Sequence, residues 1–205
     1  MSSATRAAGA LVLATLVATA AAAAQGTRTQ FGAGASLTFP IGDFHADANG
    51  DGFKMGWQGI ALLDVQPRGS PVGFRVDGTY GENSSNDKFN ADLTAIVGAP
   101  TTAKIKQLGG TADVVYHFKR SSGGVAGYLI SGIGVYNVKL AITSGNTTAD
   151  SSETKFVWNF GAGLTYALGG AALFFEARYV DVSKSFGAAK TTFIPFTAGV
   201  RFGGK

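Results

Sequence analysis

Residues 156–179 read FVWNFGAGLTYALGGAALFFEARY. Every second residue from 156 to 166 is apolar and most residues between them are small or polar, while 173–179 set apolar residues against Glu176 and Arg178. An alternation with period two indicates a strand with one apolar face, and Gly169-Gly170 fits a tight hairpin turn. The stretch therefore predicts an antiparallel hairpin with an apolar face and a charged face.

The same alternation recurs along the chain, in residues 31–39, 54–66, 72–80, 107–119, 128–140 and 194–202. Together with the hairpin, these segments predict eight strands. Connections centred on Gly69, Ser122 and Gly169 are tight, whereas residues 40–52, 81–103, 144–154 and 182–192 are longer and polar. Short turns at one end and long loops at the other are typical of membrane barrels. We expect an all-β fold, an eight-stranded antiparallel up-and-down transmembrane β-barrel.

The composition limits what the chain can be. Its 205 residues are 45% hydrophobic and only 15% charged, with 30 Gly and no Cys. These values predict one ordered domain and exclude disulfides, thiol catalysis and cysteine-bound metals. Lys and Arg form no cluster of four or more that would indicate nucleic-acid binding.

The N-terminal segment predicts an export signal. Arg6 precedes an uncharged run over residues 7–18, and Ala22-Ala23-Ala24 fits a small-residue cleavage site. A transmembrane helix is the alternative, but the apolar core of about a dozen residues is short for one. We expect residues 1–24 to be a signal peptide, with Gln25 as the mature start and residues 25–205 as the barrel domain.

Most aromatic residues lie on the apolar parity of the strands, many near strand ends, as lipid-facing girdles require. The predicted lipid-facing aromatics are Phe31, Trp57, Phe74, Tyr80, Tyr116, Phe118, Tyr128, Tyr136, Phe156, Trp158, Tyr166, Phe175, Tyr179, Phe196 and Phe202.

The opposite parity carries charges, which would be unpaired in the dry core of a soluble lipocalin-like carrier but suit the lumen of a membrane barrel. The predicted lumen charges are Asp64, Arg75, Asp77, Asp113, Glu176, Arg178 and Arg201. We expect Gly163 and Gly161 to lie opposite Glu176 and Arg178 in the hairpin.

An eight-stranded barrel leaves little room inside, and an aqueous channel needs about 16 strands. A salt-bridged structural plug is therefore the favoured interpretation of the lumen charges. By the same counting across the turn at Gly69, Asp64 should face Arg75. An ion or small-solute path is the alternative.

The sequence contains no recognisable catalytic or cofactor-binding motif. The chain has two His, at positions 45 and 117, and no Gly-x-Ser-x-Gly or phosphate loop. The predictions are no enzyme activity and no cofactor. Asp47, Asn49 and Asp51 match the opening of a calcium loop, but Gln58 stands where the bidentate Glu belongs, so an ordinary acidic loop is favoured.

Several segments together resemble a known family: residues 128–134 (YLISGIG), 161–166 (GAGLTY), 175–179 (FEARY) and 197–202 (TAGVRF). In order and spacing they resemble the small "porin family" or outer-membrane β-barrel domain proteins, the group related to the OmpA barrel and to opacity and attachment proteins. Members usually end on an aromatic residue, whereas Gly203-Gly-Lys205 follows Phe202 here.

This resemblance implies a bacterial outer-membrane location, with membrane lipid and the barrel-assembly machinery as partners. It also implies a structural or surface-interaction role, in which the long loops contact a surface ligand. A solute pore or ligand-binding barrel is the alternative function, and a soluble carrier the more distant one.

Overall fold

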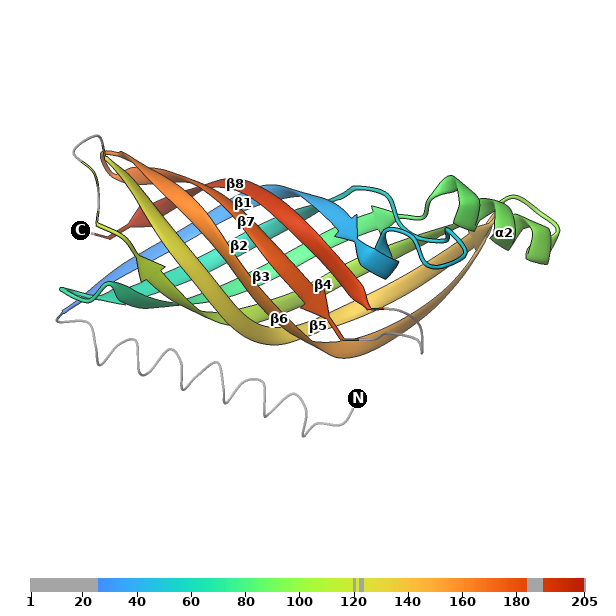
Figure 1. Ribbon diagram of the computed structural model, residues 1–205, viewed down its shortest axis with the longest axis horizontal. Helices are drawn as coiled ribbons and strands as arrows, with labels where there is room; N and C mark the ends of the chain where they lie inside the picture. Colours follow the sequence, from blue (N-terminus) through green and yellow to red (C-terminus); the bar gives the residue numbers. More distant parts are fainter. Residues whose placement is uncertain (1–25, 120, 122–123, 184–189, 205) are drawn as a thin grey trace.

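The computed structural model describes residues 26–119, 121, 124–183 and 190–204, and they form one closed antiparallel barrel whose strands follow chain order (Figure 1). The strands are β1 (Thr27–Ile41), β2 (Gly56–Pro67), β3 (Val72–Ser84), β4 (Thr101–His117), β5 (Val125–Ser144), β6 (Thr147–Leu168), β7 (Ala171–Val182) and β8 (Thr191–Gly203). The predicted eight-stranded fold is confirmed. The proposed cleavage after Ala24 lies outside the described residues and stays a prediction.

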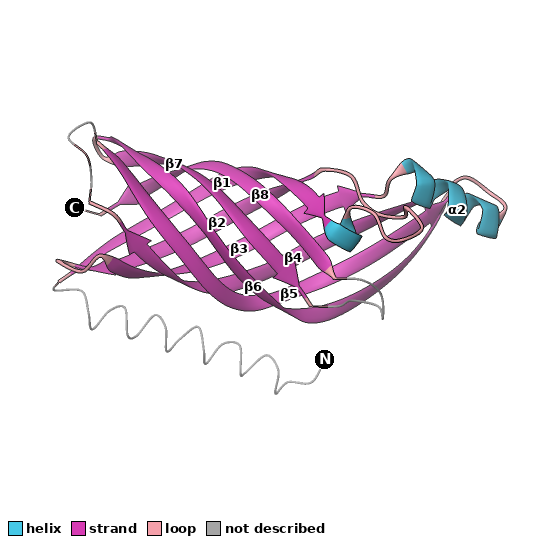
Figure 2. Ribbon diagram, in the orientation of Figure 1, coloured by secondary structure: helices cyan, strands magenta, loops and turns pink. Residues whose placement is uncertain are grey.

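The strands are strongly tilted, as Figure 2 shows. Following paired residues once around the barrel from Phe31 leads back to Ile41, ten residues further along β1. A stagger of this kind is what closing a sheet into a barrel requires. Residues paired across successive strands therefore rise steadily toward the loop end of the barrel.

The two ends of the barrel differ as the connection lengths predict. Pro67 and Val72 bound one short turn and Leu168 and Ala171 another, and Gly69 and Gly169 adopt φ of 80° and 65° there. This left-handed conformation costs glycine little. The opposite end carries the 3-10 helix η1 (Gly42–Phe44) and helix α2 (Asp87–Val97), which projects beyond the strands (Figure 2).

The long connection expected over residues 81–103 is in part regular structure. It contains the end of β3, the start of β4 and α2. Asn86 caps α2 by accepting a hydrogen bond from the Phe89 N–H at 2.8 Å, and Gly98 ends it with φ of 77°. Both are standard capping signals. Among the described residues, no helix is long and apolar enough to cross a membrane.

The prediction of a loop over residues 144–154 is wrong. β5 and β6 continue as a hairpin to the pair Ser144 and Thr147, turning at Gly145, whose φ is 56°. Most of its tip residues are exposed. Because neither face of the hairpin tip is buried, its sequence has no apolar alternation and therefore resembles that of a polar loop.

Apolar side chains cover the outside of the barrel and charged ones lie inside. Thirteen of the predicted lipid-facing aromatics are on the outer face, for example Phe31, Phe74 and Phe196, whose exposure exceeds half. The prediction is wrong for Tyr128 and Tyr136, which are only 1% and 3% exposed and point into the lumen.

The facing of β5 is ambiguous in the sequence because both of its faces are apolar. Leu129, Ile133 and Val135 are the exposed residues, whereas Tyr128 and Tyr136 alternate with them on the inner side. Inner glycines on neighbouring strands make room for the two tyrosines: a Cβ on Gly163 would lie 2.3 Å from Tyr128 Cζ, and one on Gly109 would lie 2.1 Å from Tyr136 Cδ1.

The inside-out polarity predicts a difference between the two faces of β6. Ala162→Arg, on the exposed outer face at mid-strand, should lower the free energy of unfolding by about 2–4 kcal/mol because it places a charge in lipid. Thr165→Arg, on the inner parity near the short-turn end, should cost less. Urea unfolding of the vesicle-inserted protein measures both, and equal costs would contradict the assignment of faces.

Candidate functional site

Four charged side chains form a closed ring across the middle of the lumen. Arg75 Nε donates to Asp77 at 2.6 Å and Arg75 Nη1 donates to Glu176 at 2.7 Å. Arg178 Nε donates to Glu176 and Arg178 Nη2 to Asp77, both at 2.6 Å. Arg75 and Asp77 come from β3, Glu176 and Arg178 from β7. All four are buried, so the ring ties two opposite walls of the barrel together.

Asp113 on β4 extends this ring through neutral donors. Its carboxylate accepts hydrogen bonds from Thr111 Oγ1 at 2.7 Å and from Asn159 Nδ2 at 2.8 Å. Arg178 Nη1 is 3.5 Å from both Asp113 and Asn159. Side chains from β3, β4 and β6 thus converge on the Arg178 guanidinium.

Tyr128 links the ring to a second layer nearer the short-turn end. Its hydroxyl donates to Glu176 at 2.7 Å and accepts from Arg201 Nη2 at 3.0 Å. The Arg201 guanidinium lies 4.8 Å from the ring centroids of both Tyr128 and Phe174. Stacking between aromatic faces favours a buried guanidinium.

Asp64 pairs with this second layer. Arg201 Nη1 lies 3.4 Å from its carboxylate, and His117 Nε2 lies 3.8 Å from it. In the strand register Asp64 does stand opposite Arg75, as the sequence predicts, but its ion partner is Arg201.

The predicted seven lumen charges are all buried and belong to these two layers. The expected pairing of Gly161 with Arg178 and of Gly163 with Glu176 is confirmed. The space at Gly163 is taken by Tyr128, which the sequence pattern places outside. Tyr128 stands opposite Gly163 in the strand register, and this pairing is the signal that could have placed Tyr128 inside the barrel.

An apolar layer closes the loop end of the lumen. Phe44 of η1 lies against Phe53 and Phe193, with ring centroids 5.1 and 6.3 Å away. Val157 and Val180 belong to the same buried cluster. Between this layer and the ionic ring, a cavity of about 20 Å³ is lined by polar residues such as Thr111 and Asn159. That volume holds about one water molecule.

The calcium-loop candidate closes on itself. Asp47 Oδ1 accepts hydrogen bonds from the backbone N–H of Asn49 at 2.7 Å and of Asp51 at 3.0 Å. Gln58, at the twelfth position, is buried on the inner face of β2. Burial and the Asp92 carboxylate raise the pKa of Asp51, while Lys88 opposes this effect. Within the described ranges, no group of three acidic, His or Cys residues could hold a metal ion.

The loop end also exposes apolar side chains. Ile96 and Val97, at the end of α2, are 81% and 52% exposed. Helix α2 is the described element that extends furthest from the barrel (Figure 1).

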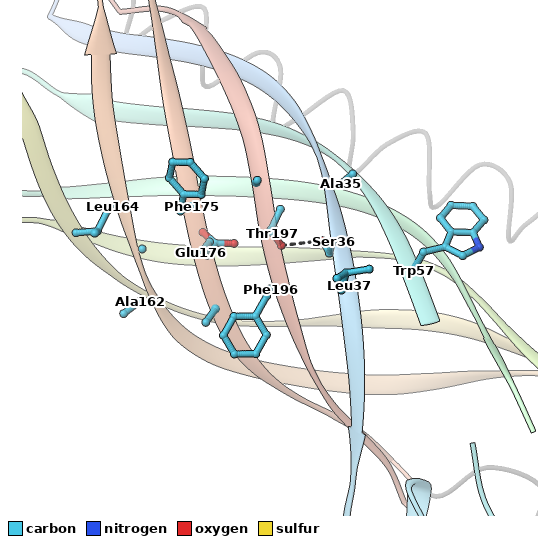
Figure 3. A pocket seen from close by; sticks show the side chains of 13 residues that line it. Ala35, Ser36, Leu37, Trp57, Ala162, Leu164, Phe175, Glu176, Phe196 and Thr197 are labelled. Carbon is cyan, nitrogen blue, oxygen red and sulfur yellow. Dashed lines mark hydrogen bonds between the residues drawn. The ribbon is translucent and has the colours of Figure 1, made fainter. Parts of the chain in front are cut away.

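The outer wall carries shallow apolar grooves. One, of about 730 Å³, is lined by small residues such as Ala35 and Ala162 together with the larger Leu164, Phe175 and Phe196 (Figure 3). Glu176 and the hydrogen-bonded pair Ser36 and Thr197 lie on the inner side of the same wall.

Several solved structures share this fold, although a comparison with curated protein sequences finds no match. Neisserial surface protein A is similar in structure, with TM-score 0.54 and 20% identity over 86% of this chain and 96% of that one. A major outer membrane protein of Thermus thermophilus has TM-score 0.59 and 11% identity, over 86% and 98% of the two chains.

The attachment invasion locus protein Ail of Yersinia pestis, solved with the heparin analogue sucrose octasulfate, has TM-score 0.50 and 17% identity, over 86% and 99% of the two chains. At these identities the structures show a shared fold. The sequence itself matches one family over residues 10–202. The chain therefore belongs to the outer membrane protein beta-barrel domain family.

Proposed function

We propose that this chain is a non-enzymatic outer-membrane protein with a plugged lumen, which acts through its loop end as a structural or surface-contact protein. The observation that carries the proposal is the ionic ring of Arg75, Asp77, Glu176 and Arg178, which joins opposite walls of the barrel. Ions or solutes would have to break these contacts to pass.

Two further features support a closed interior. The ring is followed toward the loop end by a cavity of only about 20 Å³ and then by the apolar layer of Phe44, Phe53 and Phe193. Buried opposite charges at 2.6–2.7 Å form strong charge-assisted hydrogen bonds. The alternative of a pore or ligand-binding lumen requires these groups to separate.

The orientation of the barrel in the membrane follows from the different lengths of the connections at its two ends. Short turns of membrane barrels face the periplasm and long loops face outward. This rule places α2 on the cell surface, where the exposed Ile96 and Val97 can meet a partner. Insertion of the barrel by the assembly machinery belongs to the same proposal.

A closed lumen predicts an electrically silent protein. Purified protein in planar lipid bilayers should show little or no steady conductance, because the ring and the apolar layer both block the path. A porin of about 16 strands in the same bilayers is the positive control. Large, stable open conductance would contradict the plug and favour transport.

The ring also predicts a stability effect. Glu176→Gln removes the carboxylate shared by Arg75 and Arg178 and leaves two buried cations short of a partner. It should lower the free energy of unfolding by about 3–5 kcal/mol, measured by urea titration in vesicles. Asp87→Asn breaks the exposed pair with Lys54 and should cost less than about 1 kcal/mol. Similar small losses for both would mean that the ring does not hold the barrel.

The surface-contact role predicts that the α2 tip matters outside the cell and not for folding. Ile96→Ser combined with Val97→Ser should leave barrel stability unchanged within about 0.5 kcal/mol. Cells that display this variant should aggregate and attach to apolar surfaces less than cells with the unaltered chain. Asp87→Ser, an exposed polar change on the same helix, is the matched control. If cells with the unaltered chain attach no better than cells that lack the protein, this role is excluded.

A further inference from the structure

Lysines gather on the outer face of the barrel at the loop end. Lys106 of β4 and Lys139 of β5 are directly opposite in the strand register, and Lys104 lies two residues further along the same face of β4. Their side chains are partly exposed. Like charges in directly opposite positions destabilise a strand pair, so an anion between them would be favourable.

The neighbouring carboxylates compensate these lysines incompletely. Glu82 is shared: one of its oxygens lies 2.7 Å from Lys104 Nζ and the other 3.8 Å from Lys106 Nζ. Asp150 pairs with Lys139. These five groups carry a net charge of +1, and Lys106 is beyond hydrogen-bond distance of its carboxylate.

An apolar groove opens on the outer wall over β2, β3 and β4, next to Lys106 on its short-turn side. Its volume is about 420 Å³, with Gly59 and Gly78 as the floor and Trp57, Tyr80 and Leu108 as walls. Leu108 lies two residues below Lys106 on the same face of β4, and Trp57 pairs with Glu82 in the register. A Cβ built on Gly78 meets nothing within 4 Å, so the groove above it is open.

We propose that this face binds one anionic, phosphate-bearing membrane lipid, with its headgroup between Lys106 and Lys139 and an acyl chain along Gly59 and Gly78. The proposal rests on the transmembrane placement argued above, which sets the lysines at headgroup level just beyond Trp57 and Tyr80. Aromatic residues belong at the membrane interface, and lysines there attract anionic lipid.

The larger groove of Figure 3 provides a contrast within the same molecule. It is also lined by small and aromatic side chains on the outer wall, and the described residues that line either groove include no Lys or Arg. The smaller groove differs in that its wall residue Leu108 lies two residues from Lys106 on the same face of β4. The larger groove fits acyl chains without selecting a headgroup. Charge complementarity thus distinguishes the groove beneath Lys106 from the groove at Ala198.

Trp57 offers a direct test because the chain has only two Trp. Trp158→Phe leaves Trp57 as the single fluorophore, which borders both this groove and the larger one of Figure 3, so the preference between lipids is the quantity to compare. The protein is inserted into phosphatidylcholine vesicles that contain an equal fraction of either brominated phosphatidylglycerol or brominated phosphatidylcholine. Bromine on the acyl chains quenches Trp57, and the anionic lipid should occupy its site several times more often, on the order of fivefold for each uncompensated lysine.

Matched variants separate the headgroup from the groove. Lys106→Gln with Lys139→Gln should reduce the preference for phosphatidylglycerol toward one, whereas Lys119→Gln, at the short-turn end, should not change it. Gly78→Leu should fill the groove and reduce quenching by the anionic lipid. Ala198→Leu fills the other groove, which Trp57 also borders, so it should leave the preference of anionic over neutral lipid unchanged. Heat-modifiable migration on a gel verifies that each variant is folded.

Equal quenching of Trp57 by both brominated lipids, or a preference that survives Lys106→Gln with Lys139→Gln, would overturn the proposal. Loss of the preference on adding millimolar inorganic phosphate, beyond the loss with chloride of equal ionic strength, would assign the lysines to a free anion instead of a lipid. Quenching by neither lipid would contradict the transmembrane placement itself.

Discussion

Glu176 is the residue on which the interior depends. Its carboxylate accepts hydrogen bonds from Arg75 and Arg178 and from the Tyr128 hydroxyl, which come from three different strands. In lipid the outer wall gains little from burying apolar side chains against one another, because the surrounding solvent is as apolar as they are. The cross-lumen ionic contacts therefore join opposite walls in the middle of the lumen, while the buried apolar cluster fills its loop end.

This arrangement needs a particular distribution of small residues. An eight-stranded lumen has room for side chains only when some positions carry none. A Cβ on Gly161 would lie 2.8 Å from Arg178 Cγ, and one on Gly132 would lie 2.0 Å from Asp113 Oδ1. Phe174 likewise passes over Gly199, where a Cβ would lie 2.5 Å from its ring. The inner glycines leave the space that the long charged and aromatic side chains occupy.

The sequence sufficed to predict the barrel because lipid outside and charge inside impose a clear alternation on most strands. It also predicted the register of the last hairpin, since Gly169-Gly170 leaves few ways to pair Gly163 with Glu176. The alternation failed where one face does not differ from the other. β5 is apolar on both faces, which misplaced Tyr128 and Tyr136, and the tip of the β5–β6 hairpin is polar on both. The partners of Asp64 and Tyr128 depend on contacts across the lumen, which no local pattern encodes.

The charge count of the ring and Asp113 explains why neutral side chains donate to Asp113. Two guanidinium groups, Arg75 and Arg178, serve three carboxylates, those of Asp77, Asp113 and Glu176. Asp77 and Glu176 each receive a close donor from both arginines, so Asp113 is left with the long contact of 3.5 Å. Thr111 and Asn159 supply the missing donors as neutral hydrogen bonds, which satisfy the carboxylate without adding another buried cation. Because the close contacts already engage the carboxylates from several strands, a passing ion would have to displace donors that are held in place on opposite walls.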